Sequence, residues 1–142
     1  MNFSSISTVL APLDLEDPAP EIVRLAIEVA GDPADVHVIY VLPMLEPSLM
    51  ARIDDKHRVR HATEALQTWL VDEGFPDTVR THVKVGDAAH VTEALIGELG
   101  AELVVLRSHG RTGVRRLLLG SVAERIARLA RCPVLLLKAE ED

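Results

Sequence analysis

Residues 103–138 read LVVLRSHGRTGVRRLLLGSVAERIARLARCPVLLLK and contain the pattern that decides the fold. The apolar run at 103–106 is typical of a buried strand, and so is the run at 134–137. Between them, SVAE at 121–124 has serine and glutamate at the spacing of a capping box. This predicts a helix over about 121–131 with the serine as its N-cap. Two strands joined through a helix predict a parallel pair with a right-handed crossover.

The chain before residue 103 shows the same alternation of strands and helices. Its apolar or alternating runs predict strands at 8–12, 36–42 and 79–85, with helical patterns between them. The sequence therefore predicts an α/β fold, in which a doubly wound five-stranded parallel sheet has helices on both faces. A length of 142 residues fits a single domain spanning 1–142.

The helices between these strands have their own signals. Asp17-Pro18 predicts an N-cap followed by proline at the first helical position. Gly86-Asp87 is expected to start the helix that follows the third strand. Residues 43–54 contain two prolines and little periodicity, which predicts a long loop or a poorly ordered lid. The second helix has one apolar face, formed by Val59, Ala62, Leu66, Trp69 and Leu70.

The strand compositions indicate where each strand lies in the sheet. Residues 79–85 alternate strictly between polar and apolar side chains, which is typical of an edge strand, whereas the first, second and fourth strands have the apolar runs of central ones. The last strand is wholly apolar, and an unpaired apolar edge is an aggregation liability unless a second chain covers it. We therefore expect a homodimer formed through Val134, Leu135, Leu136 and Leu137.

Composition limits the classes of function. The 22 acidic residues exceed the 15 lysines and arginines, giving a net charge of −7, which argues against binding to nucleic acid or to an anionic membrane. No apolar stretch approaches the roughly 20 residues of a membrane span, and residues 1–14 lack the pattern of a secretory signal. The single cysteine, Cys132, fits a reducing compartment, so we expect a cytoplasmic protein.

The loop after residue 106 is strongly basic. Arg107, Arg111, Arg115 and Arg116 stand within ten residues without an acidic neighbour. One interpretation is a solvated turn with glycines for the bends. The other is an anion site, because backbone N–H groups at a helix N-terminus and nearby arginines together bind phosphate. The pattern by itself favours neither interpretation.

Asp14 follows the first strand directly. If the first and fourth strands are neighbours, Asp14 faces the crevice at the carboxyl ends of the strands, where ligands of such sheets bind. A carboxylate there accepts from a ribose hydroxyl or holds Mg²⁺ against phosphates. A turn or cap residue is the alternative interpretation.

The chain resembles the universal stress proteins over its full length. Their signature is Gly-x2-Gly-x9-Gly-Ser/Thr after the fourth strand, and Gly110, the nine-residue spacer and Gly120-Ser121 match it. TVLAPLD at 8–14 is similar to the family's first strand and its aspartate. VHVIYVLP, VKVGDAA and RCPVLLLK are similar to the second, third and last strands.

This resemblance implies the strand order 3-2-1-4-5 and a homodimer joined along the last strands. In the nucleotide-binding branch it also implies ATP, AMP or another adenine nucleotide in the crevice, with Mg²⁺ bound through the phosphates and Asp14. Asp14 would meet the ribose or the metal, and the main chain of Val41 would meet adenine. His109 and Gly110 would line the phosphates. The nucleotide-binding positions carried over are Pro12, Leu13, Asp14, Val41, Leu106, Arg107, His109, Gly110, Gly120, Ser121 and Val122, the last three donating to the phosphates.

Arg107 departs from the signature, which has glycine there. If that position needs a positive φ, arginine costs about 1 kcal/mol or more and crowds the ligand. If the backbone has ordinary strand geometry, the guanidinium adds a ligand for phosphate instead.

The expected function is therefore that of an adenine-nucleotide-binding regulatory module of the stress response. It is not an enzyme, since no nucleophile–base pair is visible, and any ATP hydrolysis is slow and incidental. The first alternative is a universal stress protein that binds no nucleotide and acts as a dimeric interaction module. The second is a receiver-like phosphoacceptor domain, although Asp87 lies past a glycine instead of ending the third strand.

Two other groups of residues favour structural interpretations. His57 and His61 have metal-ligand spacing on a helix but no evident third ligand, which favours a solvated face. Cys132, entering a core strand, is interpreted as a packing residue and not as a reactive thiol.

Overall fold

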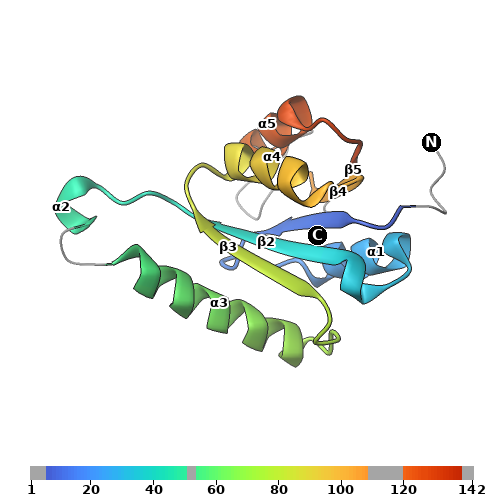
Figure 1. Ribbon diagram of the computed structural model, residues 1–142, viewed down its shortest axis with the longest axis horizontal. Helices are drawn as coiled ribbons and strands as arrows, with labels where there is room; N and C mark the ends of the chain where they lie inside the picture. Colours follow the sequence, from blue (N-terminus) through green and yellow to red (C-terminus); the bar gives the residue numbers. More distant parts are fainter. Residues whose placement is uncertain (1–5, 51–53, 109–119, 139–142) are drawn as a thin grey trace.

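In the computed structural model, which describes residues 6–50, 54–108 and 120–138, five parallel strands form one sheet. Its order β3-β2-β1-β4-β5 confirms the topology that the family resemblance implies (Figure 1). The strands are β1 (Val9–Leu13), β2 (Val36–Leu42), β3 (Arg80–Val85), β4 (Leu103–Arg107) and β5 (Val134–Leu137). As predicted, β3 and β5 are the edges.

Helices cover both faces of the sheet. Helices α4 (Ala88–Leu99) and α5 (Ser121–Leu129) lie side by side on one face, and α1 (Pro20–Ala30) and α3 (Asp55–Asp72) lie on the other (Figure 1). A 3-10 turn, η2 (Pro33–Asp35), precedes β2. None of the helices in the described ranges is long and apolar enough to cross a membrane.

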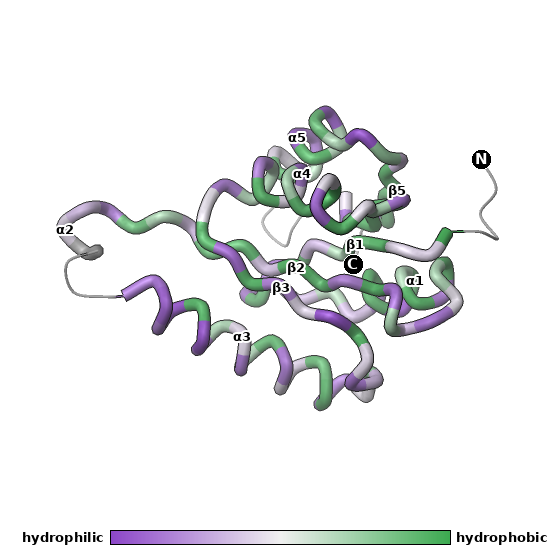
Figure 2. The backbone as a smooth tube through the Cα atoms, in the orientation of Figure 1, coloured by the Kyte–Doolittle hydropathy of each residue, from purple (hydrophilic) through white to green (hydrophobic). Residues whose placement is uncertain are grey.

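Each face of the sheet has its own apolar layer. Val9, Val38 and Val105 belong to the layer under α1 and α3, whereas Leu10 and Ile39 belong to the layer under α4 and α5. All five side chains are completely buried. Central strands of a parallel sheet must be apolar on both faces, which explains their continuous hydrophobic runs. In Figure 2, β1 and β2 are largely green, whereas α3 alternates between hydrophilic and hydrophobic residues along its length.

The prediction that Asp17 caps the first helix is wrong. Helix α1 begins at Pro20, and Ala19 is the N-cap residue, with φ −118° and ψ 91°. The helical region is disfavoured for a residue before proline, and the extended backbone of Ala19 agrees with this. The amide of Asp17 donates instead to the carbonyl of Asp14, 3.1 Å away, in a turn.

The prediction of a capping box at 121–124 is also wrong. Gly120 is the N-cap of α5, with φ −69° and ψ 160°, and Ser121 is the first helical residue. The amide of Gly120 donates to the carbonyl of Ser108, 2.6 Å away, and this bond fixes where the helix starts. The side chain of Ser121 is exposed.

The segment predicted as a loop at 43–54 contains a short helix, α2 (Pro47–Met50). Figure 1 shows residues 43–46 leading away from the sheet toward it. The guanidinium of Arg58 in α3 donates to the carbonyl of Pro43, 2.9 Å away, and so connects the start of this segment to α3.

Two histidines pair between β2 and the edge strand β3. The Nδ1 atom of His37 lies 2.8 Å from Nε2 of His82, and the rings stack with centroids 5.0 Å apart. Burial lowers the pKa of both imidazoles. The positive charges of His82 and then Arg80 lower the pKa of His37 further. The positive charges of Lys84 and then Arg80 do the same for His82. Asp35 and Glu98 oppose the shifts only in part.

We expect acidification to destabilise the protein through this pair. The pKa of each folded imidazole lies below its ordinary value of about 6.5. The unfolded chain therefore takes up protons first, and stability falls as the pH drops through 6.5 toward the folded-state pKa values. Melting temperatures between pH 7.5 and 5.5 test this. The double variant His37→Phe/His82→Phe should lose less stability over that range than the wild type, and equal losses would count against the assignment.

Candidate functional site

A cavity of about 680 Å³ opens at the carboxyl ends of β1, β2 and β4. This is the point where β1 and β4 are neighbours and the strand order reverses, which is where doubly wound sheets bind ligands. The first turns of α4 and α5 border the cavity. Its lining consists of Pro12, Leu13, Asp14, Glu16, Asp17, Ala19, Ile22, Ile39, Tyr40, Val41, Pro43, Ala88, Thr92, Leu106, Arg107, Gly120, Ser121, Val122, Ala123 and Ile126.

The structure brings most of the predicted site positions to this one cavity. Nine of them line it, namely Pro12, Leu13, Asp14, Val41, Leu106, Arg107, Gly120, Ser121 and Val122. His109 and Gly110, together with Arg111, Arg115 and Arg116, lie outside the described residues. The grouping connects positions from β1, β2, β4 and α5, which are far apart in the sequence.

The sequence interpretation missed part of the lining. Ile39 and Ile126 form apolar walls beside the predicted Leu106, and Ala88 and Thr92 extend them from α4. Thr92 is completely buried, and among the described residues its hydroxyl has no hydrogen-bond partner. Ala88 and Thr92 are four residues apart on one helix face, so helical spacing was the signal that could have found them.

Asp14 lies directly after β1 at the cavity rim, with an exposed side chain. Its Oδ1 accepts from the amide of Glu16, 2.9 Å away, and its carbonyl accepts from the amide of Asp17. Asp14 therefore stabilises the turn after β1 while it faces the crevice. The two interpretations drawn from the sequence are compatible with each other.

Arg107 ends β4 with ordinary backbone geometry, because none of the described non-glycine residues has a positive φ. The strain considered for an arginine at this position is therefore absent. Its guanidinium is directed to acids near the start of α1: Nη1 lies 3.5 Å from Asp17 and Nε lies 3.9 Å from Glu21. These distances are long for hydrogen bonds, so the contacts are mainly electrostatic.

The start of α5 borders the cavity, and its first backbone N–H groups have no acceptor within the helix. The amide of Glu124 makes the first intrahelical bond, 2.9 Å to the carbonyl of Gly120. The amides of Ser121, Val122 and Ala123 precede it and have no partner within the helix. The amide of Gly120, predicted as a donor to ligand, is already used by Ser108. Among the described residues, the amides of Ser121, Val122 and Ala123 are thus the candidate donors for an anion.

The described part of the rim is acidic. Asp14, Glu16 and Asp17 line the cavity on the β1 side, and Arg107 faces them from β4. Burial raises the pKa of the Tyr40 phenol, and the charges of Asp14 and Glu16 raise it further. A phosphate group entering on this side meets repulsion, which directs anionic groups toward α5 and Arg107.

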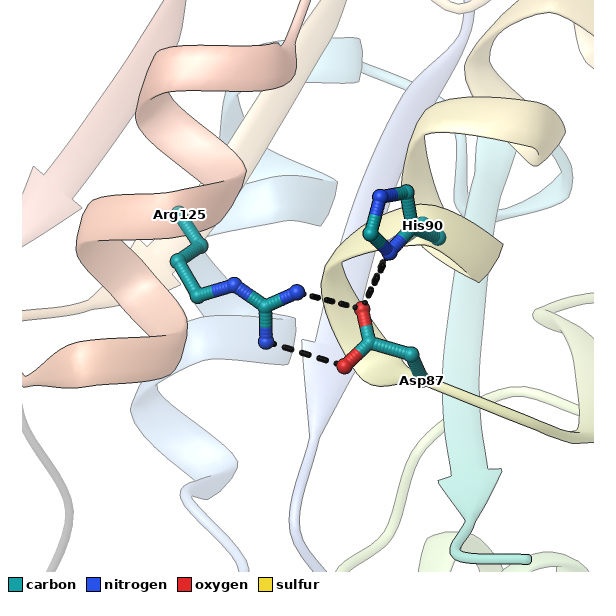
Figure 3. A network of polar contacts seen from close by, with 3 residues as sticks. All are labelled: Asp87, His90 and Arg125. Carbon is teal, nitrogen blue, oxygen red and sulfur yellow. Dashed lines mark hydrogen bonds and ion pairs between the residues drawn. The ribbon is translucent and has the colours of Figure 1, made fainter.

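A network of polar contacts joins α4 to α5 next to the cavity (Figure 3). The carboxylate of Asp87 accepts from both terminal nitrogens of Arg125, at 2.9 Å each. It also caps α4, accepting from the backbone amide of His90 at 3.1 Å and lying 2.7 Å from the ring Nδ1 of the same residue. The hydrogen bonds from Arg125 and His90 hold the pKa of Asp87 well below its usual range.

This network argues against a receiver-like phosphoacceptor. Asp87 follows the edge strand β3 instead of lying at the crevice between β1 and β4, and its carboxylate is occupied by Arg125. It is not part of the cavity lining.

The remaining candidate residues behave as ordinary structural ones. The side chains of His57 and His61 are exposed on α3. Within the described ranges, no three histidine, cysteine or acidic side chains form a group that could hold a metal ion. Cys132 packs against the apolar layer under α4 and α5, and burial raises the pKa of its thiol, so the reactive thiolate is disfavoured.

Comparisons with known proteins agree with this architecture. The model of the universal stress protein family matches residues 5–138. The chain is 31% identical over 133 residues to universal stress protein G of Shigella flexneri, covering 89% of this chain and 91% of that protein.

Two solved structures show the same fold. Protein MJ0577 superposes with a TM-score of 0.73 at 22% identity, covering 96% of this chain and 99% of the other. A universal stress protein in complex with cAMP gives a TM-score of 0.58 at 22% identity, with 95% and 98% covered. With the family model spanning nearly all of the sequence, the chain belongs to the universal stress protein family.

Proposed function

We propose that the protein is a cytoplasmic regulatory module that binds an adenine nucleotide between β1 and β4. One observation carries the proposal: a single cavity is lined by Asp14, Val41 and the first turn of α5. In this assignment the base contacts Val41 between apolar walls. The ribose hydroxyls contact Asp14, and the phosphates lie at Ser121 and Val122.

The dimensions and chemistry of the cavity fit such a ligand. A volume of about 680 Å³ lies within the roughly 300–1,000 Å³ of small-molecule sites, which combine apolar walls with a few polar groups. A helix N-terminus favours phosphate through its free amides and its dipole. A structural neighbour holds cAMP, which supports an adenine ligand for this fold.

A magnesium ion, if it accompanies the nucleotide, would be held largely by phosphate oxygens. Asp14 is the carboxylate we assign to it, because its Oδ1 alone is engaged in the turn with Glu16. No three-ligand group in the described ranges supplies a complete metal site. The ion would screen the acidic rim from the phosphates. We assign no catalytic residues, and any ATP hydrolysis would be incidental.

The arrangement around Arg107 favours a second candidate, a universal stress protein that binds no nucleotide and acts as an interaction module. The guanidinium is already paired with Asp17 and Glu21, and Glu16 adds negative charge to the rim. A ligand must displace these acids to use Arg107. We rank this candidate second because the first amides of α5 have no hydrogen-bond acceptor among the described residues.

The quaternary structure that we propose is a homodimer through β5. This strand is an edge of the sheet, and Leu135 and Leu136 are 38% and 37% exposed on it. Pairing with a second copy would cover both leucines and satisfy the open backbone edge.

Calorimetric titration with ATP, AMP, cAMP and adenosine, with and without Mg²⁺, tests the proposed function. Asp14→Ala should lower the affinity for all four ligands about tenfold or more, because a hydrogen bond to a charged group contributes about 1.5–3 kcal/mol. Arg107→Ala should lower the affinity for ATP by a similar factor and leave the affinity for adenosine unchanged. The ATP effect should shrink at high salt, because exposed charges are screened.

Asp32→Ala is a matched control for Asp14. Asp32 also accepts from the amide two residues later, at 2.9 Å, but lies outside the cavity. The Asp32→Ala variant should therefore bind nucleotide like the wild type. Absence of binding at millimolar concentrations, or tighter ATP binding by Arg107→Gly, would favour the second candidate.

A further inference from the structure

Two polar contacts fix the N-terminal part of helix α5. The first is the hydrogen bond from the amide of Gly120 to the carbonyl of Ser108. The second is the bidentate pair between Arg125 and Asp87. Arg125 is about one turn after Ser121, so the second contact acts just behind the amides that face the cavity.

The partner of Arg125 is itself immobilised. Asp87 is the N-cap of α4, and its carboxylate is fixed by the backbone amide and the ring of His90 (Figure 3). Two parallel N–H···O bonds to a fixed carboxylate set the orientation of the guanidinium as well as its distance. The pair therefore joins the N-cap of α4 to the start of the second turn of α5.

We infer that Asp87 and Arg125 are positioning residues for ligand binding: together they hold the first turn of α5 in the orientation at which its amides meet the anionic group of the ligand. The inference rests on the proposed function for the identity of that ligand. Neither residue lines the cavity, so both act through the helix and not by contact with the nucleotide. Ala88, the first residue of α4, does line it, so the same pair also locates that wall.

Three single variants separate this role from general destabilisation. Asp87→Asn keeps a side chain that caps helices well and removes the charged, bidentate partner. Arg125→Met removes the guanidinium and keeps an unbranched helix-forming side chain. Arg128→Met is the matched control, because Arg128 stands on the same helix, is 71% exposed and, among the described residues, pairs with Glu124 alone.

Titrations with ATP and adenosine should distinguish the three variants. Asp87→Asn and Arg125→Met should each weaken ATP about three- to tenfold and leave adenosine within about twofold. Arg128→Met should bind both ligands like the wild type. The double variant should lose no more ATP affinity than Arg125→Met alone, because the two residues act as one unit.

The sign of the Asp87→Asn effect excludes a simple charge explanation. Removing an acid near a phosphate site makes the local potential more positive, so a purely electrostatic effect would tighten ATP binding. Positioning predicts the opposite, weaker binding. Tighter ATP binding by Asp87→Asn overturns the inference.

Hydrogen–deuterium exchange of the ligand-free protein provides a readout that needs no nucleotide. The amides of residues 124–126 should exchange about three- to tenfold faster in Asp87→Asn and Arg125→Met than in the wild type and in Arg128→Met. If the wild type binds no nucleotide, the proposed function fails, whereas faster exchange still supports the positioning of α5. Unchanged exchange in both variants refutes the positioning role whatever the ligand.

Discussion

Gly120→Trp is expected to abolish nucleotide binding while the protein remains folded. Gly120 lines the cavity at the start of α5, beside the amides of Ser121 and Val122. Its φ of −69° and ψ of 160° are accessible to any residue, so the backbone tolerates a side chain here. An indole at this position would occupy the space assigned to the phosphates. We expect at least about a hundredfold loss of ATP affinity, corresponding to about 2.7 kcal/mol.

Gly97→Trp is the control for this substitution. Gly97 lies in α4, where an added Cβ would meet nothing within 4 Å, and it is outside the main cavity. This variant should bind ATP normally. Calorimetry and a melting curve for each protein provide the measurement. A folded Gly120→Trp protein that still binds ATP would show that the phosphates lie elsewhere.

The second large effect is expected at the sheet edge. Leu136→Lys should convert the proposed dimer into a monomer, because two symmetric copies would each bury an unpaired ammonium group. Burial of a polar group without a partner costs about 1–3 kcal/mol on protein scales, and more when it is charged. The dimer dissociation constant should therefore rise at least about a hundredfold. Since Leu136 is 37% exposed in the single chain, the monomer should still fold.

Sedimentation equilibrium at micromolar concentrations checks this prediction. Val71→Lys is the control, since Val71 is a 68% exposed apolar residue on α3. Helix α3 packs against β3, the edge of the sheet opposite to β5. That variant should remain dimeric. A wild-type protein that is already monomeric would disprove the dimer, and a dimeric Leu136→Lys protein would place the interface elsewhere.

The architecture could be predicted from the sequence because each strand has a local pattern. The almost wholly apolar run at Val36–Leu42 marks a central strand, and the alternation of residues 79–85 marks the edge that β3 occupies. Helix starts were less predictable. Pro18 and Pro20 compete for the same position, and the restriction on Ala19 decides between them.

The candidate site was predictable only where the family signature or the strand ends pointed to it. Asp14 follows from the end of its strand, whereas Val41 and Ser121 follow from the family resemblance. The contact of Arg107 with Asp17 and Glu21 could not be predicted, because the residues lie 90 and 86 positions apart and no pattern connects them. The use of the Gly120 amide by Ser108 was hidden for the same reason.

The hydrogen bond between Gly120 and Ser108 also has a consequence for how the family can diversify. It closes a ring in the chain, so β4 ends and α5 starts at the same point in space. Changing the length of a closed segment is cheap, since each doubling costs only about 0.6 kcal/mol in entropy. A change of length between Ser108 and Gly120 is therefore expected to cost little loop-closure entropy, as long as this hydrogen bond is kept.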